Sequence, residues 1–421
     1  MTKRFTQTPL RTRARGHKLA AAMASALFGL LAVGAHAGEP ILIEPAAIDD
    51  FKVVYQFDGT QGGTPYTALV RGADHALYGT TWSFGPNGGG TVFRLGAAGA
   101  LTTVAAFGYN GSAGPTGPVV LAHDGNFYGV GDAGSAVLAG NLFRVSPTGV
   151  VTYLHTFPAN GDVTGSNPSP GLVLGPDGAL YGTATAGGAG GSGVVFRITL
   201  AGDYSVVHSF VGTDGSGPRA RLTVGADGLF YGTTQGGGSA GFGTVFRMNL
   251  QGKVTTLHSF AGAPADGASP IAPVIVGADG HLYGTTSYGG ANGMGTVYRV
   301  SRNERSERKE RVLHSFAADG VDGTVPWGGL LQASNGRFYG TTSSGGPLPS
   351  VCNGGWGCGT IFEITNEGRY HLVHTFTTGP GGQYPLESLF EAQDGRLYGA
   401  AYGDPNLPTD RLGALFSIGQ R

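Results

Sequence analysis

Short segments of mostly apolar, β-branched and aromatic residues alternate with glycine-rich turns along residues 51–419. This pattern predicts β-strands throughout and no long amphipathic helix. In each unit we expect four strands, named a to d in chain order. Examples are strand a at residues 171–174, strand c at 244–248 and strand d at 255–260, with strand b at a Tyr-Gly pair and an Asp-Gly turn before it. Four antiparallel strands in about 50 residues are typical of a β-propeller blade.

The unit recurs seven times. The Tyr-Gly pair lies at intervals of 50, 53, 50, 52, 56 and 59 residues, at Tyr78, Tyr128, Tyr181, Tyr231, Tyr283, Tyr339 and Tyr398. A proline precedes each tyrosine by 13 residues, at Pro65, Pro115, Pro168, Pro218, Pro270, Pro326 and Pro385. Strand c of each unit carries one aromatic residue: Phe93, Phe143, Phe196, Phe246, Tyr298, Phe362 and Phe416. Such regular spacing indicates a repeat architecture.

The two ends of the repeat region are complementary. Residues 53–57 form a strand d with no unit of its own, and the last unit stops after its strand c at residues 413–418. If the first strand completes the last blade, the ring closes and hides both edges. The sequence therefore predicts an all-β fold, a seven-bladed β-propeller over residues 51–419.

The sequence motifs of the units resemble those of a known family. The matching residues are Leu282-Tyr283-Gly284-Thr285-Thr286-Ser287-Tyr288-Gly289-Gly290, then Gly295-Thr296-Val297-Tyr298 and Leu313-His314-Ser315-Phe316. They are similar to the GloVer (Gloeobacter–Verrucomicrobia type) tandem-repeat family of exported bacterial β-propeller-like proteins, and the resemblance covers nearly all of residues 51–419. The resemblance implies a secreted or surface propeller and brings no established reaction and no agreed catalytic residues.

The N-terminus has the features of an export signal. Basic residues from Lys3 to Lys18 precede an uncharged apolar stretch from Leu19 to Val33, and Ala35-His36-Ala37 follows as a small-x-small cleavage pattern. This stretch is shorter than the ~20 residues of a membrane-spanning helix. We expect a signal peptide at residues 1–37, a linker at 38–50, no transmembrane segment in the mature chain, and a periplasmic or extracellular location.

The two cysteines agree with an oxidising compartment. Cys352 and Cys358 lie in one glycine-rich loop of the sixth unit, where we expect a local disulfide. Two thiols alone do not complete a zinc site, so we expect no metal there.

The amino-acid composition and net charge argue against some classes of binding partner. Glycine accounts for 79 of 421 residues, and charged residues for only 13%. With a formal net charge of −1, the chain lacks the basic surface of a nucleic-acid-binding protein. We expect no nucleic-acid partner and no cofactor, and a monomeric protein.

Other candidate chemistry has a simpler structural interpretation. The strand d histidines of different blades are expected to lie too far apart to share an ion, and to form hydrogen bonds within their blades: His155, His208, His258, His314 and His374. Residues 237–241 match G-x-S-x-G but are not followed by a helix. Asp319 and Asp322 suit a turn better than calcium, and residues 302–311 (RNERSERKER) suit a solvated loop or a partner contact between strands c and d.

Six aromatic residues outside the repeated positions predict a binding surface. They fall in the d–a or b–c loops of units six, seven and one, which open on one face of a propeller: Tyr66, Trp82, Trp327, Trp356, Tyr384 and Tyr402. The residue after each blade proline also varies, from Trp327 and Tyr66 to Thr116, Ser169, Arg219, Ile271 and Leu386. A varied residue on a constant scaffold is typical of a recognition surface.

The sequence thus favours an exported non-catalytic binding or display module whose ligand is a glycan, peptide or protein on the d–a/b–c face. One alternative is a propeller-type enzyme acting on glycans, a hydrolase or lyase, which would need acids or a histidine grouped at the central channel. The other is a structural surface protein without a small ligand.

Overall fold

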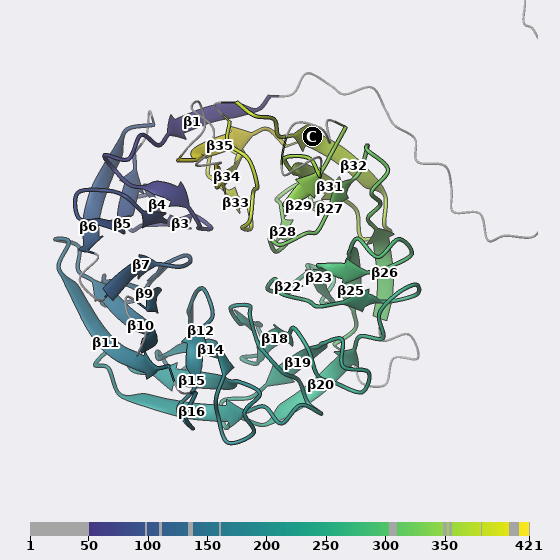
Figure 1. Cartoon of the computed structure of the whole chain (residues 1–421), viewed down its shortest axis with the longest axis horizontal. Helices are drawn as coiled ribbons and strands as arrows, with labels where there is room; N and C mark the ends of the chain where they lie inside the picture. The colour runs from purple at the N-terminus through teal and green to yellow at the C-terminus, as the bar shows by residue number, and fades with distance from the viewer. Residues whose placement is uncertain are drawn as a thin grey trace, which may run out of the picture. The chain divides into compact units, whose positions relative to one another are not determined.

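The computed structural model describes residues 50–96, 99–108, 112–133, 138–159, 161–302, 310–347, 352, 356–379, 381–403 and 412–420. The expected signal peptide (residues 1–37) and all but the last residue of the expected linker lie outside these ranges. The described residues form seven main antiparallel sheets arranged radially about one axis (Figure 1). The predicted seven-bladed β-propeller is confirmed.

The first three blades have five strands each, because the segment that ends at the blade proline pairs as a separate strand. Blade 1 contains β2 (Gly63–Pro65), β3 (Val70–Arg71), β4 (Leu77–Ser83), β5 (Gly88–Leu95) and β6 (Leu101–Gly108). Blade 2 contains β7 (Ser112–Pro115), β8 (Val120–Leu121), β9 (Phe127–Ala133), β10 (Leu138–Val145) and β11 (Val151–Pro158). Blade 3 contains β12 (Ser166–Pro168), β13 (Val173–Leu174), β14 (Leu180–Ala186), β15 (Val194–Ile198) and β16 (Tyr204–Ser209).

The next three blades have four-stranded main sheets. Blade 4 contains β17 (Thr223–Val224), β18 (Phe230–Thr234), β19 (Thr244–Met248) and β20 (Val254–Ser259). Blade 5 contains β22 (Ile275–Val276), β23 (Leu282–Thr286), β25 (Thr296–Val300) and β26 (Glu310–Ser315), with the pair β21 (Gly267–Ala268) and β24 (Tyr288–Gly289) beside them. Blade 6 contains β28 (Leu331–Gln332), β29 (Phe338–Thr342), β31 (Thr360–Ile364) and β32 (Tyr370–Thr375), with the pair β27 (Gly323–Thr324) and β30 (Ser344–Gly345).

The seventh blade closes the ring with a strand from the other end of the chain. Its strands are β33 (Phe390–Glu391), β34 (Leu397–Ala401) and β35 (Ala414–Ile418), and β1 (Lys52–Gln56) pairs antiparallel with β35 on the outside. The N-terminal strand completes the last blade as predicted.

Strand a is shorter than the sequence predicts. In blade 3 only Val173 and Leu174 pair with strand b, although the pattern indicated residues 171–174. Pro168 and Pro170 precede this segment, and proline has no N–H to donate to a sheet. The chain nearest the axis is therefore largely free of sheet hydrogen bonds, which leaves its side chains to line the centre of the ring.

The Tyr-Gly pair has a steric cause. The aromatic residue of strand c lies opposite the glycine of strand b, as Phe246 does opposite Gly232. A Cβ atom on any of these seven glycines would come within 2.4–2.6 Å of that aromatic side chain. Glycine is thus required for the side chain to pack this closely against strand b, and all seven strand c aromatics are fully buried.

A second set of aromatics joins neighbouring blades. The phenylalanine at or just after the end of each strand d packs against the strand c aromatic of the next blade, with ring centroids 4.9–5.7 Å apart. Phe57 follows β1 and makes this contact with Phe93, so the N-terminal strand also closes the chain of aromatic contacts between blades 7 and 1. Offset and edge-to-face ring pairs of this kind are favourable beyond the area they bury.

The tyrosine of each pair donates a hydrogen bond to a carboxylate. In blade 3 the Tyr181 hydroxyl donates to Asp177 (3.1 Å), and Arg197 on strand c donates to the same carboxylate (2.8 Å). Blade 6 has Asn335 in place of the aspartate and Glu363 in place of the arginine, and Tyr339 donates to Glu363 (3.0 Å). The carboxylate has moved from the turn to strand c, so the tyrosine hydroxyl still has a carboxylate to accept its hydrogen bond.

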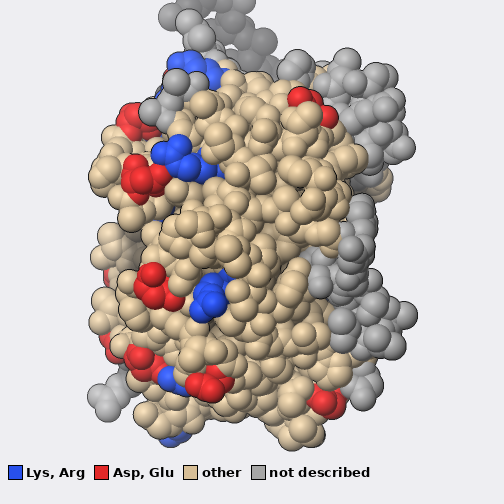
Figure 2. All heavy atoms as spheres, turned by 90° about the vertical axis from the view of Figure 1, so that its left-hand side faces the viewer, with Lys and Arg blue, Asp and Glu red and all other residues tan. Residues whose placement is uncertain are grey.

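Charged residues are sparse on the part of the outer wall that faces the viewer in Figure 2. Figure 2 shows lysine, arginine, aspartate and glutamate side chains as small scattered groups of both signs on a mostly uncharged surface. This face therefore has no single-sign patch of the kind that attracts a polyanion.

Closure by β1 can be tested by truncation. A chain that starts at residue 58 should be destabilised by more than the ~3–5 kcal/mol that a single buried phenylalanine contributes, relative to a chain that starts at residue 50. It should also associate through the exposed edge of β35. Urea unfolding and size-exclusion chromatography measure both effects, with Phe57→Ala as the single-contact control. A shortened chain that stays monomeric and equally stable would contradict closure.

The exchange in blade 6 predicts non-additive variants. Asn335→Asp alone places a second carboxylate beside buried Glu363, and Glu363→Arg alone removes the carboxylate that accepts from Tyr339. Each single variant should melt a few degrees below the wild type, whereas the double variant recreates the pattern of blade 3 and should recover most of the loss. A double-mutant cycle measures the coupling, and additive losses would refute it.

The disulfide is also directly testable. Cys352 and Cys358 are bonded and buried. Intact-mass analysis of exported protein should show no alkylated thiol before reduction and two after it. Replacing both cysteines with serine should reduce the stability of this loop by ~2–3 kcal/mol. Alkylation of both residues without a reductant would disprove the bond.

Candidate functional site

A cavity of about 340 Å³ opens near the axis, and the residues that follow the blade prolines form much of its wall. Six of these seven varied positions line it: Tyr66, Ser169, Arg219, Ile271, Trp327 and Leu386. Side chains from blades 1, 3, 4, 5, 6 and 7 therefore meet in one place, although they are far apart in the sequence.

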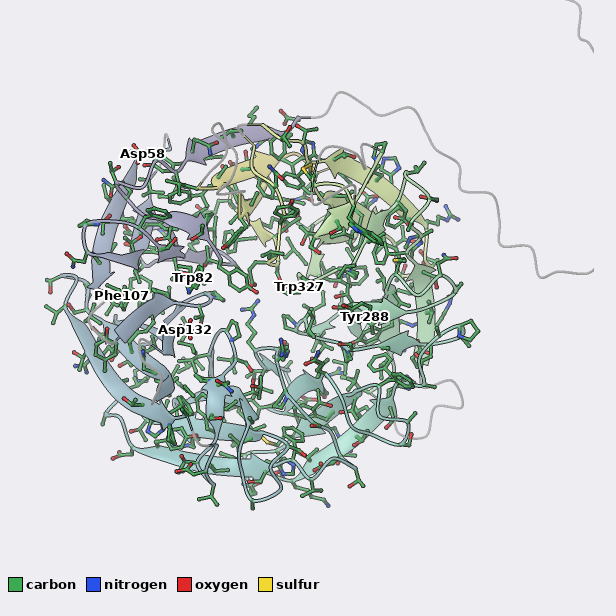
Figure 3. All side chains as sticks on the ribbon, viewed as in Figure 1. Asp58, Trp82, Phe107, Asp132, Tyr288 and Trp327 are labelled. Atoms are coloured by element: carbon green, nitrogen blue, oxygen red, sulfur yellow. A yellow bond between two sulfur atoms is a disulfide. The ribbon has the colours of Figure 1, made fainter. Side chains whose placement is uncertain are left out.

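A second cavity of about 460 Å³ adjoins the first. The two share Tyr66, Asn167, Pro168, Pro170 and Leu386. The second one adds Trp82, Tyr402, Thr116 and Asp132. In Figure 3, Trp327 lies at the inner edge of the ring, and Trp82 lies beside Asp132 on the inner side of blades 1 and 2. The two cavities form one continuous depression across the d–a/b–c face, which we call the mouth.

Backbone geometry directs these side chains toward the axis. The residue before the blade proline has a positive φ in five blades, at Thr64 (51°), Asn167 (54°), Ser269 (57°), Val325 (54°) and Tyr384 (54°). Non-glycine residues rarely adopt this conformation, and proline restricts the residue before it further. The surrounding sheets hold this strain, which fixes where the next side chain points.

Four of the six predicted aromatics line the mouth: Tyr66, Trp82, Trp327 and Tyr402. Trp82 and Trp327 remain 44% and 39% exposed, so each presents a ring face to solvent. Burial raises the pKa of the Tyr402 hydroxyl and that of Tyr66, so both hydroxyls stay protonated and able to donate.

Trp356 and Tyr384, the other two predicted aromatics, line neither cavity. Tyr384 packs on the core cluster that contains Cys358 and Phe416, and its backbone N–H donates to the Cys358 carbonyl. Trp356 is exposed in the disulfide loop and lines neither cavity. Loop conformation, which the repeat pattern does not specify, sends these two rings elsewhere.

Two polar side chains of the mouth were not predicted from the sequence. Arg221 and Glu387 line the first cavity next to Arg219. Arg219 and Arg221 are two residues apart, with a bend at Ala220 between them. The repeat pattern drew attention only to the residue directly after each blade proline, so it did not indicate Arg221 of blade 4 or Glu387 of blade 7.

Arg221 and Glu387 influence each other's charge. Burial raises the pKa of the Glu387 carboxyl to about 7, although Arg221 favours its ionised form. Burial lowers the pKa of Arg221, and Glu387 opposes this. At neutral pH the arginine is charged and the glutamate is a mixture of both protonation states.

A third cavity, of about 490 Å³, lies on the opposite face between blades 1 and 7. Its polar groups are already engaged, since Arg94 pairs with Asp74 (2.6 Å) and Tyr398 donates to Asp394 (2.8 Å). These are the tyrosine–carboxylate contacts common to the blades. The mouth, whose residues differ from blade to blade, is the better candidate site.

The strand d histidines form hydrogen bonds and ring contacts within and between the blades. Three of them share a hydrogen bond with an aspartate of the following loop: His208–Asp214 (2.8 Å), His258–Asp266 (3.0 Å) and His314–Asp322 (2.8 Å). His155 and His374 stack on the rings of Tyr204 and Phe51 of the next blade, at centroid distances of 3.7 and 3.9 Å.

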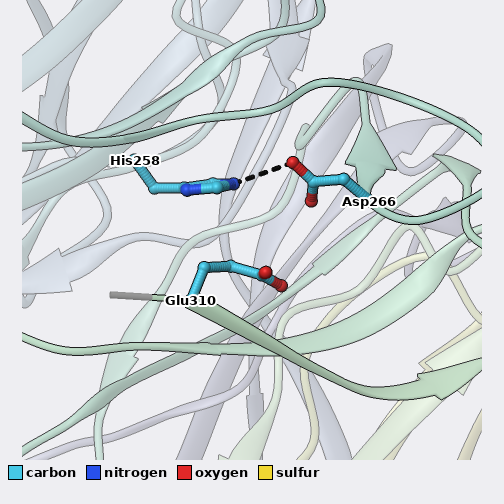
Figure 4. Close-up of side chains that lie close together, drawn as sticks. All are labelled: His258, Asp266 and Glu310. Carbon is cyan, nitrogen blue, oxygen red and sulfur yellow. Dashed lines mark hydrogen bonds and ion pairs between the residues drawn. The ribbon is translucent and has the colours of Figure 1, made fainter. Parts of the chain in front are cut away.

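At one blade junction a carboxylate takes the place of the stacked ring. Glu310 is the first residue of β26, so the end of the charged 302–311 segment is strand and not loop as expected. Its ligand atoms and those of His258 and Asp266 lie within 4.8 Å of one another (Figure 4). Imidazole and carboxylate groups are ligands for several divalent metals.

The hydrogen bonds of Asp266 argue against a metal at this cluster. Asp266 already accepts from the backbone N–H groups of Ala261 and Gly267 and pairs with His258. The same hydrogen bonds recur at Asp322, which pairs with His314 of blade 5. There the ring of Tyr370 stacks on the histidine, in the place that Glu310 takes beside His258. The pair is thus a common device that fastens the d–a loop, and we assign no metal to it.

Two solved structures with TM-scores above 0.5 support the fold. The extracellular domain of a putative hybrid two-component system from B. thetaiotaomicron has a TM-score of 0.54 at 12% identity, over 89% of this chain and 41% of that one. A second such domain from the same organism has a TM-score of 0.51 at 11% identity, over 89% and 43%. This chain therefore spans less than half of those two structures. A putative 6-phosphogluconolactonase from Bacteroides uniformis has a TM-score of 0.49 at 15% identity, over 74% and 84%.

Identities this low show the propeller fold alone. No curated protein matches the sequence. Among the described residues, no helix is both long and apolar enough to cross a membrane. The Gloeobacter/Verrucomicrobia repeat model matches residues 3–175 and 159–351. These two tandem matches cover most of the chain, which therefore belongs to the Gloeobacter/Verrucomicrobia repeat family.

Proposed function

We propose that the protein is an exported, non-catalytic binding module that holds a glycan in the mouth. The observation that carries this proposal is the convergence of six of the seven varied post-proline residues on one cavity of about 340 Å³. A constant framework that presents a different side chain from each blade suits recognition of one particular ligand.

The chemistry of the mouth favours a saccharide. Trp82, Trp327, Tyr66 and Tyr402 offer flat apolar surfaces for the C–H faces of pyranose rings. Asn167 and Asp132 lie among them and can form hydrogen bonds with hydroxyl groups. Two adjoining cavities suit an extended oligosaccharide better than a single small molecule. A peptide would also use the aromatic rings, and it is the competing outcome in the test below.

Binding accounts for the polar groups of the mouth better than hydrolysis does. A glycosidase uses two carboxyl groups that flank one scissile bond. Among the described residues of the mouth the carboxylates are Glu387 and Asp132, and these line different cavities. The wholly structural alternative leaves the exposed tryptophans at the axis without a use.

Two features support export. The basic, apolar and small-x-small regions of residues 1–37 have the order of a signal peptide. Disulfides such as Cys352–Cys358 persist in oxidising compartments. We therefore assign the mouth to ligands available in the periplasm or outside the cell.

Binding and folding should separate in two sets of variants. Trp82→Ala combined with Trp327→Ala should abolish oligosaccharide binding and leave the melting temperature nearly unchanged, because both side chains are partly exposed. Phe246→Ala, which removes the aromatic side chain that packs against Gly232, should destabilise the fold by ~3–5 kcal/mol. A glycan array identifies binders, and calorimetry with parallel melting curves measures both effects.

Two results would count against this proposal. If the double variant melts as poorly as Phe246→Ala, the tryptophans pack the structure and the mouth is no binding surface. If peptides bind and no glycan does, the ligand class is wrong.

A further inference from the structure

Among the described residues, two guanidinium groups of the mouth have no hydrogen-bond or ion-pair partner. Arg219 and Arg221 both line the first cavity. Within the ranges that the structure describes, neither side chain forms a hydrogen bond or an ion pair. Arg219 is exposed and Arg221 is half-buried, and both line the space that a ligand would occupy.

Comparison of the seven blades shows how unusual these arginines are. At the first position after the proline the other six blades carry Tyr66, Thr116, Ser169, Ile271, Trp327 and Leu386. At the third position they carry Ala68, Pro118, Gly171, Pro273, Gly329 and Ser388. Blade 4 alone places a charge at either position, and it does so at both. A propeller that needed only to fill its centre could use the small or apolar residues of the other blades.

The nearby negative charge only partly balances the pair. Glu387 lines the same cavity from blade 7 and interacts electrostatically with Arg221 at a separation greater than that of an ion pair. Two fixed positive charges thus face one carboxyl group that is partly protonated at neutral pH. Tyr66, which also lines the cavity, stays uncharged because burial raises its pKa. The first cavity is therefore electropositive and complements an anion.

The arrangement of arginine and aromatic side chains favours one kind of anion, a carboxylate carried by a sugar ring. Guanidinium groups bind carboxylates in a planar, two-pronged manner, and two of them side by side hold one carboxylate firmly. Trp327 and Tyr66 line the same cavity and offer flat surfaces for the sugar ring that carries it. We propose that the glycan is acidic, a uronate oligosaccharide whose carboxylate binds to Arg219 and Arg221. This inference rests on the proposed function and specifies the chemical class of the ligand.

The arginines can be tested without disturbing the aromatic surface. Uronate oligosaccharides are titrated into the mature protein by calorimetry, each beside its methyl-esterified, uncharged counterpart. For Arg219→Gln with Arg221→Gln, the affinity for the uronate should fall about 10- to 100-fold, as expected for lost charged hydrogen bonds. Affinity for the ester should change little. Arg369→Gln is the matched control, because Arg369 lies next to β32 in a turn between strands c and d, on the other face.

The response to pH gives a second, independent readout. Protonation of Glu387 removes a carboxylate that competes with the ligand for Arg221, so uronate binding should tighten as the pH falls from 8 to 6. Glu387→Gln should bind the uronate more tightly at pH 8 and lose most of this pH dependence. Arg219, Arg221 and Tyr66 are the other ionisable groups that line this cavity, and burial moves the pKa of the Tyr66 hydroxyl further above this range.

The outcomes distinguish this inference from the proposed function. Equal binding of the acid and its ester, or an unchanged affinity in the double arginine variant, overturns the acidic ligand and leaves glycan binding intact. Tighter binding of sugar phosphates than of uronates also overturns it. If neither neutral nor acidic glycans bind, the proposed function fails together with it.

Discussion

In every blade an aromatic side chain of strand c packs closely against the glycine of strand b, and the rest of the fold depends on that contact. A Cβ on the glycine would meet this side chain at 2.4–2.6 Å, so the two residues constrain each other in all seven blades. The buried ring then receives the strand d phenylalanine of the preceding blade. One local steric requirement therefore becomes a continuous chain of aromatic contacts around the ring, which closes at Phe57 and Phe93.

This rigid frame leaves the centre of the ring free to vary. Stability comes from the strand b, c and d side chains between the blades, whereas the strand a segment has few sheet hydrogen bonds and begins after a strained residue and a proline. Substitutions at the post-proline position therefore change the surface of the mouth with little effect on the core.

The repeats also differ where a polar contact can be made in two ways. In blade 6 the carboxylate that accepts from the buried tyrosine has moved from the turn to strand c, as Glu363. At the junction of blades 4 and 5, Glu310 faces a histidine–aspartate pair, whereas three other junctions stack a ring on the histidine. Burial and Asp266 raise the pKa of Glu310 to about 7, so the exchange brings a group that titrates near neutral pH next to the His258–Asp266 pair. Each exchange keeps the backbone and alters only the local electrostatics.

The sequence by itself determined the blade number, the strand order and the closure by β1, because each follows from short-range spacing and complementary ends. It also indicated that the residue after each proline faces a common surface. Only the tertiary structure separated Tyr66, Trp82, Trp327 and Tyr402, which share the mouth, from Trp356 and Tyr384, since loop conformation directs each ring. It alone placed Arg221 of blade 4 and Glu387 of blade 7 in one cavity. Residues on distant blades meet there because the ring curves back on itself, and no local pattern records that curvature.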